Sequence, residues 1–171
     1  MEIIKFIILT FIFLIFLLIG RQVSKKFLYR LKELIEIKEI INNMKTRIRF
    51  TYSPIKEIFD DIEKGAISIG IQEVFRNASQ NIEQLSAEES WYKAVKASEN
   101  TYLTSQDKDF FCSLGKSLGR TDIEGQVSQF DITEELIQKQ IEDARDKKDK
   151  NEKLYNQLGA IVGLAVVIVL I

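Results

Sequence analysis

Uncharged and almost entirely apolar residues form two runs at opposite ends of the sequence, one over positions 6–19 and one over 158–171. A helix over residues 3–20 would measure about 27 Å, close to the thickness of the hydrocarbon core of a bilayer. The second run would cover only about 21 Å of that core. We therefore predict an N-terminal transmembrane helix over residues 3–20. We also predict a C-terminal helix over 157–171 that is either transmembrane or membrane-embedded.

A cleaved secretory signal peptide is the alternative interpretation of the first run. Such a peptide carries positive charge before its apolar segment and small residues after it. Here Glu2 and Lys5 precede the run and four bases follow it, at positions 21, 25, 26 and 30, so a retained anchor is favoured. Because Lys and Arg beside a span stay in the cytoplasm, these bases and the lysines before the second run place residues 21–156 in the cytoplasm.

Between the two runs, apolar residues recur every three or four positions, which is the pattern of amphipathic helices. One helix is expected from Phe27 to Ile48, continuous with the first run because no breaker follows Gly20. The next begins near Ser53-Pro54, with Ser53 as N-cap and Pro54 as the first helical residue. It ends near Gly65, and a further helix carries Ile67, Ile71, Val74, Phe75 and Ala78.

Three more local signals complete the helical pattern. Capping-box sequences begin helices at Ser86 and, less typically, at Thr104. Gly119 is placed to end the second of these helices in the left-handed conformation. The last helix follows an apolar stripe from Ile123 to Ala144 and then a charged run with acids and bases four residues apart. The predicted fold class is all-α, a bundle of about six helices flanked by N- and C-terminal membrane helices.

Composition argues against catalysis and nucleic-acid binding. The chain has no histidine, one cysteine and a formal net charge of −1. Histidine is the commonest general base and metal ligand, and phosphate binding needs an excess of bases. No metal, no cofactor and no nucleic-acid partner is therefore expected, and we predict that the protein is not an enzyme. The lone Cys112 is expected to be a small buried apolar residue.

Two sets of residues are candidate sites of a structural kind. Gly159 and Gly163 stand four apart in the second apolar run, where small residues let membrane helices approach closely. Chance occurrence in a lipid-facing helix is the alternative. Because the first run is rich in Phe and Leu, a second copy of the chain or another membrane protein is the preferred partner. The other candidate is a structural turn, in which Asp122 or Thr121 caps the last helix; its members are Gly115, Gly119, Asp122 and Gln126.

Several segments taken together resemble stage III sporulation protein AB of endospore-forming Firmicutes. They are LGKSLGRTDIEGQ over 114–126, ARD over 144–146, KLYNQLGAIVGL over 153–164, SPIKEIF over 53–59 and WYKA over 91–94. Each segment alone is weak, but all occur in order and with compatible spacing. The sequence departs from the family at Ser53, where Thr is usual, and in lacking a proline between Gly65 and Ile71.

This resemblance implies a helical domain similar to the cytoplasmic domain of type II secretion and type IV pilus platform proteins. It implies a non-catalytic platform subunit of the channel between mother cell and forespore, located in the outer forespore membrane with its domain in the mother-cell cytoplasm. The implied partners are other stage III channel subunits and the secretion-type ATPase stage III sporulation protein AA. Self-association through the C-terminal helix is a further alternative. The rival function is a membrane-bound regulator that relays an envelope signal without assembling a channel.

Overall fold

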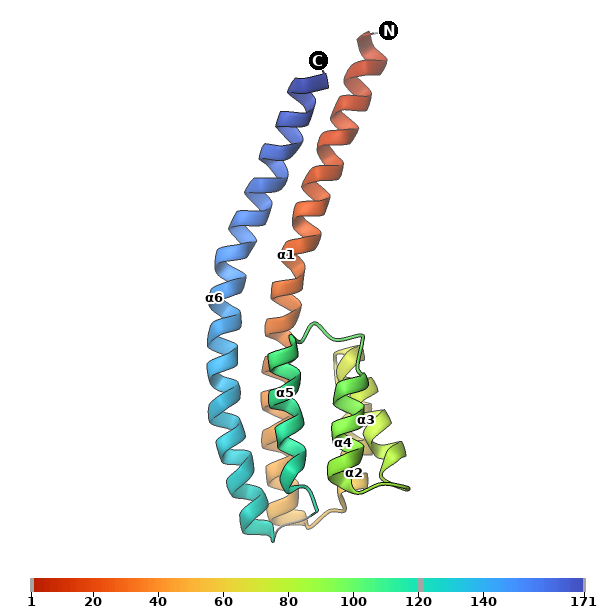
Figure 1. The fold of residues 1–171 in the computed structure, drawn as a ribbon, viewed down its shortest axis with the longest axis vertical. Helices are drawn as coiled ribbons and strands as arrows, with labels where there is room; N and C mark the ends of the chain where they lie inside the picture. Colours follow the sequence, from red (N-terminus) through yellow and green to blue (C-terminus); the bar gives the residue numbers. More distant parts are fainter. Residues whose placement is uncertain (1, 120–121, 171) are drawn as a thin grey trace. The chain divides into compact units, whose positions relative to one another are not determined.

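The computed structural model describes residues 2–119 and 122–170, so Arg120, Thr121 and Ile171 of the predicted segments lie outside the described residues. Over the described residues the chain is helical with no strand, which confirms the all-α fold class. The six α-helices are α1 (Glu2–Thr46), α2 (Ile55–Gly65), α3 (Ile69–Asn81), α4 (Ala87–Ala97), α5 (Ser105–Leu114) and α6 (Ile123–Leu170), with a π-helical turn η1 at Arg47–Thr51 and a 3₁₀ turn η2 at Gly115–Ser117 (Figure 1).

Two compact units divide the chain. The first consists of Met1–Leu31 with Asp143–Ile171, and the second is Lys32–Glu142. Helices α1 and α6 each contribute to both units, because each runs unbroken from an apolar stretch into a charged one. Residues 21–31 and 143–156, which the sequence assigns to the cytoplasmic domain, therefore belong to the same compact unit as the apolar runs.

In the first unit, the terminal stretches of α1 and α6 pack against each other as an antiparallel pair. Both helices are long and apolar enough to cross a membrane, by length and composition. The core helix of a soluble protein passes the same test, but such a helix is mostly buried. Here only 17% of the apolar window of α1 and 6% of that of α6 are buried. Large apolar side chains instead face outward, as at Phe11 and Ile161, which are 65% and 62% exposed. This distribution is consistent with association with a membrane.

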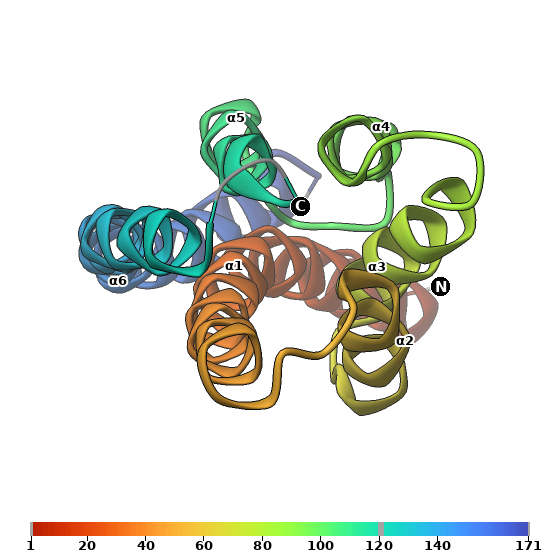
Figure 2. The same ribbon diagram turned by 90° about the horizontal axis from the view of Figure 1, so that it is seen from below.

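In the second unit, α2 to α5 run up and down with short connections, each packed against the next (Figures 1 and 2). Their core is centred on Trp91, which is fully buried and surrounded by three phenylalanine rings. The ring centroids of Phe59, Phe75 and Phe111 lie 5.5, 5.1 and 4.7 Å from that of Trp91. The indole Nε1 donates a hydrogen bond to the Phe111 carbonyl at 2.7 Å, so its polar atom is satisfied inside the apolar core.

The predicted helix starts at Ser86 and Thr104 are confirmed. Ser86 and Thr104 both form complete capping boxes, with Glu89 and Asp107 as their reciprocal partners. The start of α2 differs slightly from the prediction. Pro54 precedes the first helical residue, and the Ser53 hydroxyl hydrogen-bonds Thr51 Oγ1 at 2.9 Å.

The segment between α2 and α3 also differs from the sequence prediction. Ile67 was expected inside a helix, but α3 begins only at Ile69 and Ile67 lies in a connection with 86% of its surface exposed. The physical reason is a non-local contact. The Glu36 carboxylate of α1 accepts hydrogen bonds from the backbone N–H groups of Ile67 and Ser68, which holds this connection in an extended form.

Candidate functional site: a glycine contact and a structural turn

Glycines on both helices make a close contact between α1 and α6 in the first unit. A Cβ atom added at Gly159 would lie 2.8 Å from the Phe16 carbonyl oxygen and 3.3 Å from the Cα of Gly20. A Cβ at Gly20 would lie 2.6 Å from the Tyr155 carbonyl oxygen. Because real Cβ atoms do not approach so closely, only glycine permits this separation of the two backbones.

Gly163 extends the same contact by one turn. It is buried, and an added Cβ would lie 2.9 Å from the Phe13 ring. The structure therefore sets both glycines of the C-terminal run against α1 of the same chain, whereas sequence reasoning preferred another molecule. The bulky residues of the first run led to that preference, but Gly20, which directly follows the run, faces Gly159. The Phe13 ring lies over Gly163 and does not prevent the approach of the two helices.

Polar and aromatic contacts continue the pairing beyond the apolar runs. The rings of Phe27 and Tyr155 stack at 5.9 Å. Arg30, whose side chain is only 7% exposed, binds Asp143 with both Nη1 and Nη2 at 3.3 Å. Lys147 approaches the same carboxylate to 2.9 Å. Hydrogen bonds from Lys147 and then Arg30 hold the pKa of Asp143 below its ordinary value, so this ion pair persists at neutral pH.

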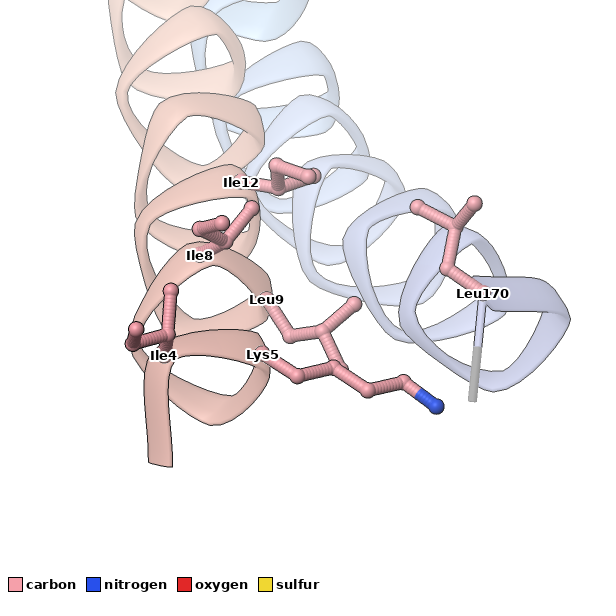
Figure 3. Close-up of a pocket in the computed structure, with 6 residues that line it drawn as sticks. All are labelled: Ile4, Lys5, Ile8, Leu9, Ile12 and Leu170. Carbon is pink, nitrogen blue, oxygen red and sulfur yellow. The ribbon is translucent and has the colours of Figure 1, made fainter. Parts of the chain in front are cut away.

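At the other end of the pair the two helices leave an apolar groove of about 430 Å³ between them (Figure 3). It is lined by Ile4, Lys5, Ile8, Leu9, Ile12 and Leu170. The first turns of α1 and the last turn of α6 thus line one groove, because antiparallel pairing places the start of α1 beside the end of α6. Its walls are almost wholly hydrocarbon, with the Lys5 amine as the only charged group drawn there (Figure 3).

The predicted structural turn connects α5 to α6. Its two glycines, Gly115 and Gly119, are required for different physical reasons. Gly119 has a φ of 73°, the left-handed conformation expected from the sequence. It does not end α5 directly as predicted, because α5 ends at Leu114 and the 3₁₀ turn η2 follows. Gly115 has an ordinary φ of −67°. A Cβ there would lie 2.5 Å from Cδ1 of Trp91, so Gly115 is required by close packing against the core. Sequence reasoning recognised the turn but not this contact, because Trp91 is distant in sequence.

Asp122 and Gln126 begin α6 on the other side of the turn. The Asp122 carboxylate accepts a hydrogen bond from the Gly125 N–H at 2.9 Å, as an N-cap residue does. Its carbonyl accepts the first helical bond, from Gln126 N–H at 3.0 Å. Gln126 is itself buried. The alternative cap, Thr121, lies outside the described residues.

Two carboxylates of α1 that could not be recognised from the sequence hold connections of the second unit. Glu33 is 3% exposed and accepts a hydrogen bond from the Tyr102 N–H at 2.7 Å. Burial, only partly offset by that hydrogen bond, raises the pKa of Glu33 to about 7. Glu36 holds Ile67 and Ser68 in the same manner. The sequence gives no signal that either carboxylate is held by a distant backbone, since glutamates on a helix are usually solvated.

No group of three or more His, Cys, Asp or Glu side chains that could hold a metal ion occurs in the part of the chain that the structure describes. Cys112 is buried as expected, and burial raises the pKa of its thiol.

These features define an all-helical protein with two candidate membrane helices that pair antiparallel. The same two helices also contribute to a second helical unit, Lys32–Glu142. Comparison with protein families then identifies it further: residues 5–171 match the family described as stage III sporulation protein AB, so the chain belongs to this family. No match is found among curated proteins or among solved structures.

Proposed function

We propose that the chain is a non-catalytic platform subunit of the channel complex between mother cell and forespore, and that it docks a secretion-type ATPase. Its paired apolar helices anchor it in the outer forespore membrane, with the helical unit in the mother-cell cytoplasm. Other stage III channel subunits and stage III sporulation protein AA are the partners. Family membership supports a role in sporulation.

The pairing of the two apolar helices is the observation that most supports a platform. Gly20 and Gly159 fix their contact in the first unit, and Arg30 with Asp143 continues it. Two membrane helices that flank the helical unit hold it in a fixed position. A fixed position suits a protein that binds a force-generating ATPase. The positive charges after the first apolar run support the cytoplasmic placement of the helical unit.

Co-purification tests this function against the relay alternative. The full-length chain carrying an affinity tag is purified in detergent from sporulating cells, and an equally tagged, unrelated two-span protein is the control. The platform requires selective recovery of the ATPase and of other channel subunits, in a complex larger than the subunit itself. Recovery of the chain without channel subunits, in small complexes with a signalling protein, would favour the relay.

A further inference from the structure

The connection between α4 and α5, residues 98–104, contains no helix or strand and is attached to α1 through its backbone (Figure 1). The Tyr102 N–H donates a hydrogen bond to Oε2 of Glu33 on α1 at 2.7 Å. Glu33 is only 3% exposed. The attachment therefore keeps a carboxyl group buried where the connection meets α1.

The charged groups around Glu33 disfavour its ionised form. Helix α1 contributes Glu36, and α5 contributes Asp107 and Lys108. Asp107 is itself only 1% exposed. The base of the group, Lys108, also donates a hydrogen bond from its amine to the carbonyl of Ser98. Two acids thus oppose one base, so that a negative charge on Glu33 is repelled as well as deprived of water.

The α4–α5 connection has weak support besides this attachment. The hydroxyl of Thr101 is buried without a hydrogen-bond partner among the described residues, which costs free energy that opening would recover. The Asn100 amide donates to both oxygens of Glu73, but that pair is exposed. Opening of this connection therefore requires less free energy than unfolding of the aromatic core around Trp91.

We propose that Glu33 is a proton-dependent attachment, which holds the α4–α5 connection on α1 while it is protonated and releases residues 98–104 by local opening when it ionises. The core around Trp91 stays folded during this opening. Leu103, which is 8% exposed in the closed form, becomes accessible, so the surface near the connection changes with pH. This inference does not depend on the proposed function.

The direction of the pH effect follows from the two forms of Glu33. In the closed form, burial first and then Glu36 and Asp107 raise its pKa to about 7. In the released form the carboxyl is hydrated and returns to its ordinary value of 4.5. The released form therefore loses its proton at lower pH, and the opening equilibrium rises from about pH 4.5 to about pH 7 and levels off above. Between pH 5 and pH 8 the rise is on the order of 50-fold.

Hydrogen exchange of the full-length protein in nanodiscs tests the attachment. Exchange of residues 98–104 is followed by mass spectrometry from pH 5 to pH 8, and each rate is divided by the intrinsic rate at the same pH. In wild type the protection of this segment should fall on the order of 50-fold, and in Glu33→Gln by less than about 3-fold, because Gln accepts the Tyr102 N–H bond without titrating. The matched control is Glu39→Gln, an exposed position on α1, which should behave as wild type.

Constant protection in wild type, or a full decrease in Glu33→Gln, overturns the inference. An internal control is the pair of N–H groups of Ile67 and Ser68, which the half-buried Glu36 holds. Their protection should stay nearly constant over the same pH range. A decrease in parallel with residues 98–104 would show that Glu33 is not the group responsible.

The urea dependence of exchange separates local opening from global unfolding. A local opening exposes little surface, so the protection of residues 98–104 should depend only weakly on low concentrations of urea. Residues 91–95 of α4, in the core, should be more strongly protected and should respond steeply to urea. Equal protection and equal urea dependence of the two segments would show that the connection opens only when the whole unit unfolds, which also overturns the inference.

Discussion

Replacing Glu33 by Gln should remove a pH dependence of stability that wild-type protein shows between about pH 5 and pH 7.5. Glu33 is almost fully buried, and its pKa in the folded protein is about 7, against an ordinary value of 4.5. The cause is burial first; Glu36 and Asp107 act in the same direction, while the Tyr102 N–H and Lys108 oppose them. The chain also has no histidine, the side chain that ordinarily titrates in this range.

The sign of the effect follows from proton uptake. Between pH 4.5 and about 7 the folded protein retains the Glu33 proton that the unfolded chain has lost. Folding therefore takes up a proton, and stability falls as pH rises through this range. The difference between the two pKa values corresponds to about 3 kcal/mol at about 1.4 kcal/mol for each pKa unit. Acids whose pKa is lowered, such as Asp60 and Glu134, act below their ordinary values and leave this window unaffected.

Gln keeps an oxygen that can accept the Tyr102 N–H bond but carries no charge. Glu33→Gln should thus unfold like wild type at pH 5 and be more stable by about 2–3 kcal/mol at pH 8. Urea denaturation of the full-length protein in detergent, followed by the fluorescence of its only tryptophan, Trp91, measures both. Glu39→Gln, an exposed position on the same helix, is the matched control. Equal stability of wild type and Glu33→Gln at pH 8 would refute the reasoning.

Four more changes have defined outcomes. Trp91→Ala should cost about 3–5 kcal/mol, because it leaves a cavity among three phenylalanine rings; a loss below 1 kcal/mol in denaturation monitored by circular dichroism would contradict the buried position. Gly119→Val should cost about 1–2 kcal/mol through strain at positive φ, whereas Gly119→Asn should cost less in the same assay. Gly159→Leu should separate α1 from α6, and the loss of cross-linking by a short bifunctional thiol reagent between cysteines placed at Phe27 and Tyr155, whose rings stack across the pair, would report it in a Cys112→Ser background; an unchanged cross-linking yield would argue against the contact. A cysteine after Ile171, in a Cys112→Ser background, should react with an impermeant thiol reagent only from the non-cytoplasmic side if both apolar helices span.

Local sequence determined the starts of α4 and α5 and the left-handed glycine of the main turn. The capping boxes at Ser86 and Thr104 and the left-handed Gly119 depend on contacts within four residues along the chain. Such contacts form wherever the local sequence permits, so they can be read without knowing the fold. The two apolar runs are equally evident, because hydrophobicity is a property of the segment itself.

Tertiary structure decided which surfaces these helices bury and which they expose. Gly20 is required only because it lies against Gly159, which is more than a hundred residues away in the sequence. Gly115 is required only because it packs against Trp91. The burial of Glu33 and the exposure of Ile67 likewise depend on which connection lies against α1. Sequence periodicity gives the apolar face of a helix but not the partner of that face, since pairing depends on backbone separations that are fixed only when distant segments pack together.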